Sequence, residues 1–193
     1  MSLFFVLMDR QNTSNEKRTL YARAADYVYS VFSAVILIML CFFVLFTFFF
    51  RLASVDGSSM NPNLYDKQKI IVSNFLYTPE YGDIIAIGRA SEEENSIIKR
   101  VIGLPGDEID INFDTHIITV NAGVITEDYE TIGAISEKGD TDFPVTVPEN
   151  CVFVLGDNRN NSIDSRFSSV GFIDLDEIAG KALFSLFPPG SIY

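Results

Sequence analysis

Two residues of this sequence, Ser59 and Lys99, are of types that together could perform nucleophilic catalysis. Ser59 lies between Gly57 and Pro62 in the segment DGSSMNPNL, so a flexible residue precedes it and a rigid one follows it. A serine in such a turn is well placed to be an exposed nucleophile, although Gly-Ser-Ser runs are also ordinary loops. A hydroxyl needs a nearby base before it attacks a carbonyl, and a neutral lysine amine is one such base.

Lys99 lies in the run SIIKRVI, whose apolar residues predict a β-strand. Alternation along a strand places Lys99 on the same face as Ile97 and Val101, which is the apolar side. Burial among apolar side chains disfavours the charged amine, so it lowers the pKa of a lysine. The simpler interpretation is a lysine whose stem lies on apolar surface while its charge reaches water.

A third segment, GDNRNNSIDSRF at residues 156–167, is dense in polar groups and directly follows an apolar run. One interpretation is a hydrogen-bonded loop that an ion pair between Asp164 and Arg166 holds together. The other is a support that orients a catalytic amine, with Ser162 as its hydroxyl partner. The two interpretations are compatible with each other.

Short apolar and β-branched runs alternate with turn signals after residue 51. The expected strands are Lys69–Ser73, Asp83–Ile87, Ser96–Ile102, Glu108–Asn112, His116–Asn121, Val145–Val147 and Cys151–Leu155. Many short strands at this spacing predict a mainly β domain, an antiparallel barrel or sandwich. One helix is expected around Asp174–Lys181, with Asp174 as its cap. The acidic, turn-rich residues 127–144 predict a loop or a small surface extension.

The 193 residues combine a net charge of −12 with 17 phenylalanines, and the apolar excess lies in one stretch. Residues 27–50 contain no charged side chain over 24 positions. At about 1.5 Å per residue, a helix of this length crosses roughly 30 Å of hydrocarbon with tilt to spare. Its apolar core exceeds the roughly 7–15 residues of a cleaved signal peptide, and no clear A-x-A site follows it. We therefore expect a retained transmembrane anchor.

The distribution of charge predicts how this anchor is oriented. Residues 1–26 have a net charge of +1, with Lys17, Arg18 and Arg23 near the membrane. Residues 51–193 hold 10 basic and 23 acidic residues, a net charge of −13. Because basic residues favour the cytoplasmic side, the N-terminal segment is expected inside and the domain outside the cell. The acidic domain also argues against binding of nucleic acid, which needs a basic surface.

Taken together, these segments make the sequence resemble the bacterial type I signal peptidases, in their short form with one N-terminal anchor. The serine box of that family, S-M-x-P-x-L, is present at residues 59–64, and its lysine box, K-R-x-x-G-x-P-G-D, at residues 99–107. The third box, G-D-N-R-x-x-S-x-D-S-R, is present at residues 156–166, and a shorter G-D-I box at residues 82–84. The family usually has threonine where this chain has Asn63.

The resemblance implies a role for each matching residue. Ser59 would be the nucleophile and Lys99 the general base, with Ser162 donating or accepting a hydrogen bond at the Lys99 amine. Asp164 and Arg166 would form a supporting ion pair. The backbone N–H of Ser59 would hold the oxyanion, an arrangement that supplies a large share of the rate in such enzymes.

The resemblance also implies a reaction, which is cleavage of exported preproteins through an acyl-enzyme after the small residue of an A-x-A site. The substrate would lie extended along sheet edges near Asp56 and Ile97. Pockets for the small side chains would be lined by Met60, Leu64, Ile97 and Ile98. The enzyme would belong to the plasma membrane, with the lipid bilayer around its anchor, and a partner in the secretion machinery is compatible with this. No metal or organic cofactor is implied, because no cluster of His, Cys and Asp has ligand spacing.

Other function classes fit the sequence less well. Sortase-like transpeptidation would use His116, Cys151 and Arg166, but the surroundings of Cys151 lack the threonine pattern of that family and suit a small buried strand residue. An inactive accessory subunit is the non-enzyme alternative, but such homologues usually lose the serine or the lysine. Lys99 argues against the eukaryotic-type peptidases, which have histidine there. The membrane span argues against self-cleaving Ser-Lys repressors, which need a DNA-binding domain.

Overall fold

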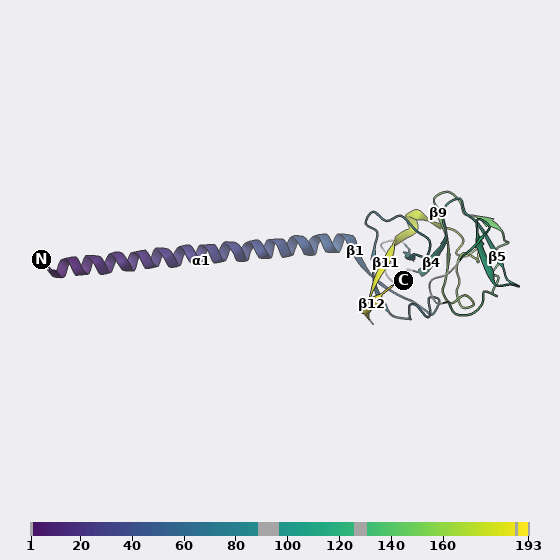
Figure 1. Cartoon of the computed structure of the whole chain (residues 1–193), viewed down its shortest axis with the longest axis horizontal. Coiled ribbons are helices and arrows are strands. Elements are labelled where there is room, and N and C mark those ends of the chain that lie inside the picture. The colour runs from purple at the N-terminus through teal and green to yellow at the C-terminus, as the bar shows by residue number, and fades with distance from the viewer. Residues whose placement is uncertain (1, 89–96, 126–130, 188, 193) are drawn as a thin grey trace. The chain divides into compact units, whose positions relative to one another are not determined.

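The computed structural model describes residues 2–88, 97–125, 131–187 and 189–192. It forms two compact units, Met1–Phe48 and Phe49–Tyr193. The first consists of one helix, α1 (Ser2–Phe49) (Figure 1). Within α1, residues Leu20–Phe49 are long and apolar enough to cross a membrane, with a mean hydropathy of 2.9. The apolar stretch was expected to end at Phe50, but Phe50 already belongs to a strand.

The second unit is built from short strands and one turn of 3₁₀ helix (Figure 1). The elements are β1 (Phe50–Ser54), β2 (Lys69–Ser73), β3 (Ile84–Ile87), β4 (Ile97–Gly103), β5 (Glu108–Asn112), β6 (Ile117–Val120), β7 (Gly123–Val124), β8 (Val145–Thr146), β9 (Cys151–Leu155), β10 (Ile173–Asp174), η1 (Leu175–Glu177), β11 (Ile178–Phe187) and β12 (Pro189–Ser191). The strands β2, β5 and β9 begin and end at the residues that the sequence predicted.

The strands form two antiparallel sheets. The larger has eight strands in the order β1-β2-β11-β3-β4-β9-β10, with β12 paired to β11. The smaller has four strands in the order β7-β6-β5-β8. The expected fold class is confirmed, since the chain is mainly antiparallel β with one N-terminal apolar helix.

Strand β4 carries Lys99 and lies inside the larger sheet between β3 and β9. Lys99 is opposite Ile85 of β3, and Arg100 is opposite Leu155 of β9. Every residue of β4 after Ile97 is buried. Both faces are covered because alternation sends Ile98 into one core cluster and Val101 into another. A lysine in the middle of this strand is therefore enclosed by apolar packing.

Three clusters of apolar side chains form the core of this unit. The cluster beneath the serine segment contains Val55, Met60, Leu64, Ile70, Val72, Ile84, Ala86, Ile98 and Ala182. A second cluster joins the two sheets through residues such as Ile109 and Phe153. The third lies on the opposite face of β3 and β4 from the first and includes Ile85 and Val101. Burial of one such side chain contributes about 1.5–3 kcal/mol, so these clusters hold the unit together.

The prediction of a helix around Asp174–Lys181 is wrong, apart from the cap at Asp174. The Asp174 side chain accepts a hydrogen bond from the Asp176 backbone N–H, as a cap does, but only the 3₁₀ turn η1 follows it. From Ile178 the chain is the strand β11, which pairs with both β2 and β3. Pairing with two distant strands overrides the local helix signal, and β11 was missed because its partners are far away in the sequence.

Candidate active site

Ser59 lies in a turn that directly follows β1 and is fixed from below by two buried side chains. Met60 and Leu64 are 0% and 1% exposed, and the Leu64 backbone N–H donates to the Met60 carbonyl at 2.9 Å. On the other side of the serine, Gly57 has a φ of +81° and donates its N–H to an Asp66 carboxylate oxygen at 2.8 Å. Ser59 itself stays partly exposed. The sequence thus folds into a rigid turn that presents one hydroxyl.

The Lys99 amine meets this hydroxyl. Its Nζ atom lies 2.7 Å from Ser59 Oγ, although 40 residues separate the two in the sequence. Lys99 is only 4% exposed. Burial lowers the pKa of Lys99 from its ordinary 10.5 to about 8, against the opposing charges of Asp164 and Asp157 and with a smaller contribution from Arg166. At neutral pH a usable fraction of the amine is therefore neutral, as a general base must be.

The loop after β9 holds the serine turn in place through its asparagines. The Asn158 backbone N–H donates to the Ser59 carbonyl at 2.9 Å, and its side-chain amide donates to the Ser58 carbonyl at 3.2 Å. The Asn161 amide donates to the Ser58 hydroxyl at 2.8 Å. These contacts cross about 100 residues of sequence. The two bonds from Asn158 fix the peptide units on both sides of Ser59 and therefore the direction in which its side chain points.

Two buried ion pairs stabilise the surroundings of the dyad. The Arg100 guanidinium contacts both carboxylate oxygens of Asp157, at 2.8 and 2.7 Å, and both side chains are 0% exposed. The Asn63 amide donates to the same carboxylate at 2.8 Å, so this pair also contacts the serine turn. The expected ion pair between Asp164 and Arg166 is present, at 2.8 and 2.9 Å, and is equally buried.

The expected hydrogen bond between Ser162 and Lys99 is absent from this structure. Ser162 is 6% exposed, and its hydroxyl is buried without a hydrogen-bond partner among the described residues. The hydroxyl instead packs over Gly156, where a Cβ atom would overlap it and would lie 2.6 Å from the Ser59 carbonyl oxygen. Only glycine leaves room for Ser162 and the serine turn to approach each other at this point.

The five residues expected to contact the substrate are Asp56, Met60, Leu64, Ile97 and Ile98. Met60, Leu64 and Ile98 are buried together in the cluster beneath the serine turn. In this structure they support the turn from inside, because almost none of their surface is exposed. Ile97 is 39% exposed at the start of β4, and Asp56 is exposed and forms an ion pair with Lys67. A substrate contact remains a prediction for all five.

Several residues at the site were not predicted from the sequence, namely Asn63, Gly156, Asp157, Asn158 and Asn161. All of them lie within the boxes that drew attention to Ser59 and Ser162. A signal was therefore present, but a single sequence does not reveal which polar residue in a loop faces which partner. Asn63 was noted only as a departure from the family pattern, and its amide turns out to bind the buried Asp157 carboxylate.

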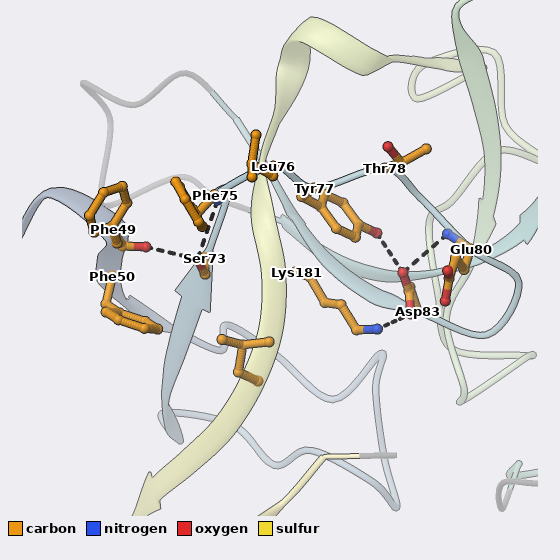
Figure 2. A pocket seen from close by; sticks show the side chains of 11 residues that line it. Phe49, Phe50, Ser73, Phe75, Leu76, Tyr77, Thr78, Glu80, Asp83 and Lys181 are labelled. Atoms are coloured by element: carbon orange, nitrogen blue, oxygen red, sulfur yellow. Dashed lines mark hydrogen bonds and ion pairs between the residues drawn. The ribbon is translucent and has the colours of Figure 1, made fainter. Parts of the chain in front are cut away.

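The short G-D-I box, residues 82–84, accepts hydrogen bonds from β4. The Gly82 carbonyl accepts a hydrogen bond from Arg100 Nη1 at 2.7 Å, and the Asp83 carbonyl accepts one from the Val101 N–H at 2.8 Å. Asp83 also lines a cavity of about 640 Å³. Figure 2 shows the Tyr77 hydroxyl and the Lys181 amine directed at the Asp83 carboxylate. None of the predicted site residues lines this cavity.

A serine hydroxyl beside a buried amine, on a mainly β unit that follows an apolar helix, is the arrangement that an anchored serine hydrolase with a lysine base requires. Comparison with known proteins identifies the family. The family model described as signal peptidase, peptidase S26, matches residues 25–187 of the chain. The chain therefore belongs to the signal peptidase family and is a protease of that family.

The individual relatives agree with this assignment. Signal peptidase I of Bacillus licheniformis is 35% identical over 188 residues, which cover 94% of this chain and 96% of the relative. Signal peptidase I S of Bacillus subtilis is 32% identical, with the same coverage of both chains. A crystal structure of a signal peptidase I from Enterococcus faecalis is 30% identical and covers 54% of this chain and 97% of that one, with a TM-score of 0.41.

Proposed function

We propose that this chain is a membrane-anchored endopeptidase that removes signal peptides from exported preproteins, with Ser59 as nucleophile and Lys99 as general base. The single observation that supports this most strongly is the 2.7 Å separation of Ser59 Oγ and the buried Lys99 Nζ. The relatives carry the name signal peptidase I, and the assignment of that activity to this chain rests on the family and on this geometry.

The reaction proceeds in two halves. The neutral Lys99 amine removes the proton of the Ser59 hydroxyl, whose oxygen attacks the carbonyl carbon of the scissile peptide bond. The backbone N–H of Ser59, which makes no hydrogen bond to a described residue, donates to the oxyanion that forms. Protonated Lys99 gives its proton to the departing amine, and the mature protein leaves.

The second half releases the signal peptide. Lys99, neutral again, takes a proton from a water molecule, and the hydroxide attacks the ester carbonyl of the acyl-enzyme. Collapse of this intermediate returns the proton from Lys99 to Ser59 Oγ and frees the carboxylate of the signal peptide. Both halves use one base at one position, so the short distance between Ser59 and Lys99 serves each of them.

The sheet offers two edges for an extended substrate. Among the described residues β1 pairs only with β2, which leaves its other edge open. On β4, pairing with β9 ends at Arg100, so no strand in the described part of the chain pairs with Ile97 to Lys99 on that side. A peptide between these edges would add a strand and pass the dyad. Recognition of small side chains at an A-x-A site is part of this proposal.

Chain length keeps the chemistry close to the bilayer. Ser59 follows the last residue of the apolar stretch, Phe49, by ten residues. Even a fully extended segment of that length reaches no more than about 35 Å. We propose that the N-terminus is cytoplasmic and the second unit extracytoplasmic, because the basic residues Lys17, Arg18 and Arg23 precede the span. Preproteins that are still held by their own apolar segment would present their cleavage site at this depth.

Cleavage of a preprotein by the purified full-length chain in detergent tests the proposal. The wild-type chain should release the mature protein at the A-x-A site, which sequencing of the new N-terminus would identify. Ser59→Ala and Lys99→Ala should each lose at least about a thousandfold in kcat/KM, because a nucleophile or its base is missing. His116→Ala is the matched control and should cleave like the wild type. Cleavage by Lys99→Ala at a near-normal rate would contradict the base assignment, and a wild type inactive on several preproteins would favour an accessory subunit.

A further inference from the structure

The acidic segment of residues 127–144 was expected to be a loop or a small surface extension, and residues 127–130 lie outside the described part of the chain. Residues 131–141 of this segment make hydrogen bonds along the loop that follows β9. We call residues 131–141 the strap and residues 156–168 the catalytic loop. The strap begins with a parallel bridge between Ile132 and Asn158, in which the Ile132 N–H donates to the Asp157 carbonyl at 3.0 Å. Three residues on, Ile135 is 3% exposed and anchors the strap in the core.

Asn160 clamps the middle of the strap with its side-chain amide. Its Oδ1 atom accepts hydrogen bonds from the Ser136 N–H at 2.9 Å, the Ser136 hydroxyl at 3.1 Å and the Glu137 N–H at 3.1 Å. Its Nδ2 atom donates to the Ala134 carbonyl at 2.8 Å. One side chain thus binds four groups of the strap, three through its oxygen and one through its nitrogen.

Arg166 fastens the far end of the strap. Its Nη1 atom donates to the Glu137 carbonyl at 2.7 Å, and its own carbonyl accepts from the N–H groups of Asp140 and Thr141 at 3.1 and 3.0 Å. The strap passes so close here that a Cβ atom at Gly139 would overlap the Arg166 carbonyl, and Gly139 has a φ of +70°. The Asp140 carboxylate then accepts two hydrogen bonds from Ser168, both at 2.6 Å.

The other side of the catalytic loop faces the dyad. Asn158 donates to the Ser58 and Ser59 carbonyls, and Asn161 donates to the Ser58 hydroxyl. The buried charges of Asp157, Asp164 and Arg166 act on the Lys99 amine. The loop has no regular secondary structure of its own, and its backbone is held between the strap and the serine turn. No hydrogen bond or ion pair among the described residues joins the strap directly to Ser59 or Lys99, so any effect on the chemistry passes through the loop.

We propose that the strap positions the catalytic loop for the Ser-Lys chemistry, that Asn160 is the positioning residue that fastens it, and that this role rests on the proposed function above. Loss of the clamp would let the loop move away from the serine turn while both ends stay attached. The hydroxyl of Ser59 would then lose its fixed direction, and water would approach the Lys99 amine. A rise of the Lys99 pKa toward its ordinary value follows from such hydration.

The test compares Asn160→Ala and Asn160→Asp with the wild-type chain on one preprotein. Asn160→Ala removes all four bonds and should lower kcat by roughly 10- to 100-fold with KM within about twofold, because orientation rather than binding is lost. The rising limb of its pH–rate profile should also move to higher pH. Asn160→Asp keeps the three bonds to Oδ1 and should recover most of kcat, and it remains informative if Asn160→Ala fails to fold. Asn74→Ala, at an exposed asparagine whose side chain makes no hydrogen bond to a described residue, is the control and should behave as wild type.

A purely structural role would give a different result. Wild-type kcat and an unmoved pH profile in Asn160→Ala, with only a lower Tm, would overturn the proposal. So would equal losses of kcat in Asn160→Ala and Asn160→Asp. Ser59→Ala assayed alongside separates this outcome from failure of the proposed function. If Ser59→Ala still cleaves, the Ser-Lys assignment is wrong, whereas an inactive Ser59→Ala beside a normal Asn160→Ala rejects the strap alone.

Discussion

At the scale of single residues, burial of the Lys99 amine lowers the stability of the folded protein and makes the amine available as a base. Its pKa is held at about 8, below the ordinary 10.5, and desolvation by burial is the largest cause. Between these two values the unfolded chain binds more protons than the folded one. The free energy of unfolding therefore rises as the pH rises from 8 to 10.5, and the full cost is present below pH 8. The shift corresponds to about 3 kcal/mol at neutral pH.

Replacing Lys99 with methionine should therefore stabilise the protein while removing its activity. At pH 7 Lys99→Met is expected to unfold at a free energy higher by up to about 3 kcal/mol, and at pH 10 the gain should nearly vanish. Urea unfolding of the full-length chain at both pH values measures this. Lys69→Met, at an exposed lysine of β2, is the control and should change little. A Lys99→Met variant less stable than the wild type at pH 7 would show that the amine is not desolvated in the folded protein.

Alanine substitutions at Ser162 and Ser165 are predicted to have different effects on Tm, although the two residues lie three positions apart. The Ser162 hydroxyl is buried without a partner among the described residues, whereas the Ser165 hydroxyl accepts from the Val154 N–H at 2.9 Å. Ser162→Ala should leave Tm unchanged or raised, because no hydrogen bond is lost, yet lower kcat by roughly 10-fold or more if the hydroxyl assists Lys99 during turnover. Ser165→Ala should lower Tm by leaving a buried N–H unpaired. Full activity in Ser162→Ala would remove Ser162 from the mechanism.

At the scale of elements, the ion pair between Arg100 and Asp157 connects β4 to the catalytic loop, and Asn63 connects both to the serine turn. Asp157→Asn leaves the Arg100 charge buried without its counter-charge and should destabilise the chain by about 3–5 kcal/mol. Asn63→Ala removes one hydrogen bond to a carboxylate and should cost about 1.5–3 kcal/mol. Urea unfolding of both variants gives the comparison. A larger loss in Asn63→Ala than in Asp157→Asn would contradict this view of the pair.

The sequence predicted strands correctly where the pattern of apolar residues within the strand itself was sufficient. The strands β2, β5 and β9 were predicted residue for residue, because their apolar positions alternate or run together between turn signals. β1 was missed because Phe50 reads as the end of the apolar stretch. The first residues of β11, up to Lys181, were included in the expected helix and the rest of the strand was missed. Its signal depends on pairing with β2 and β3, and strand pairing over a long sequence separation leaves no local mark.

The site was predictable to a similar degree and for a similar reason. Residue type and strand alternation made Ser59 and Lys99 candidates, and the resemblance to the signal peptidase boxes joined them in one hypothesis. None of these could show that the Ser162 hydroxyl has no hydrogen-bond partner among the described residues, or that Met60 and Leu64 are buried, because both depend on how the serine turn packs on the sheet. The strap was predicted only as part of an acidic loop or small surface extension. Its hydrogen bonds run mostly through backbone groups, which every sequence has, so residue types do not reveal them.

At the scale of the whole molecule, the proposed topology makes a prediction about access from outside the cell. Glu149 and Ala22 are exposed positions on either side of the uncharged residues 27–50. With Cys41 and Cys151 replaced by alanine, an impermeant thiol reagent added to intact cells should label Glu149→Cys. It should label Ala22→Cys only after the membrane is permeabilised, because the N-terminal segment is expected to be cytoplasmic. The reverse pattern would place the second unit inside the cell and rule out the proposed substrates.

The measurement that tests the central claim most directly is the pH dependence of kcat/KM for the full-length chain on a preprotein, because that parameter reports the titration of the free enzyme. Cleavage by the wild type should rise with pH along a limb centred near the Lys99 pKa of about 8 and level off above it, since only the neutral amine can take the Ser59 proton. His116→Ala should keep the same midpoint. A limb that disappears in His116→Ala, or a rate that is independent of pH from 6 to 10, would contradict a lysine base.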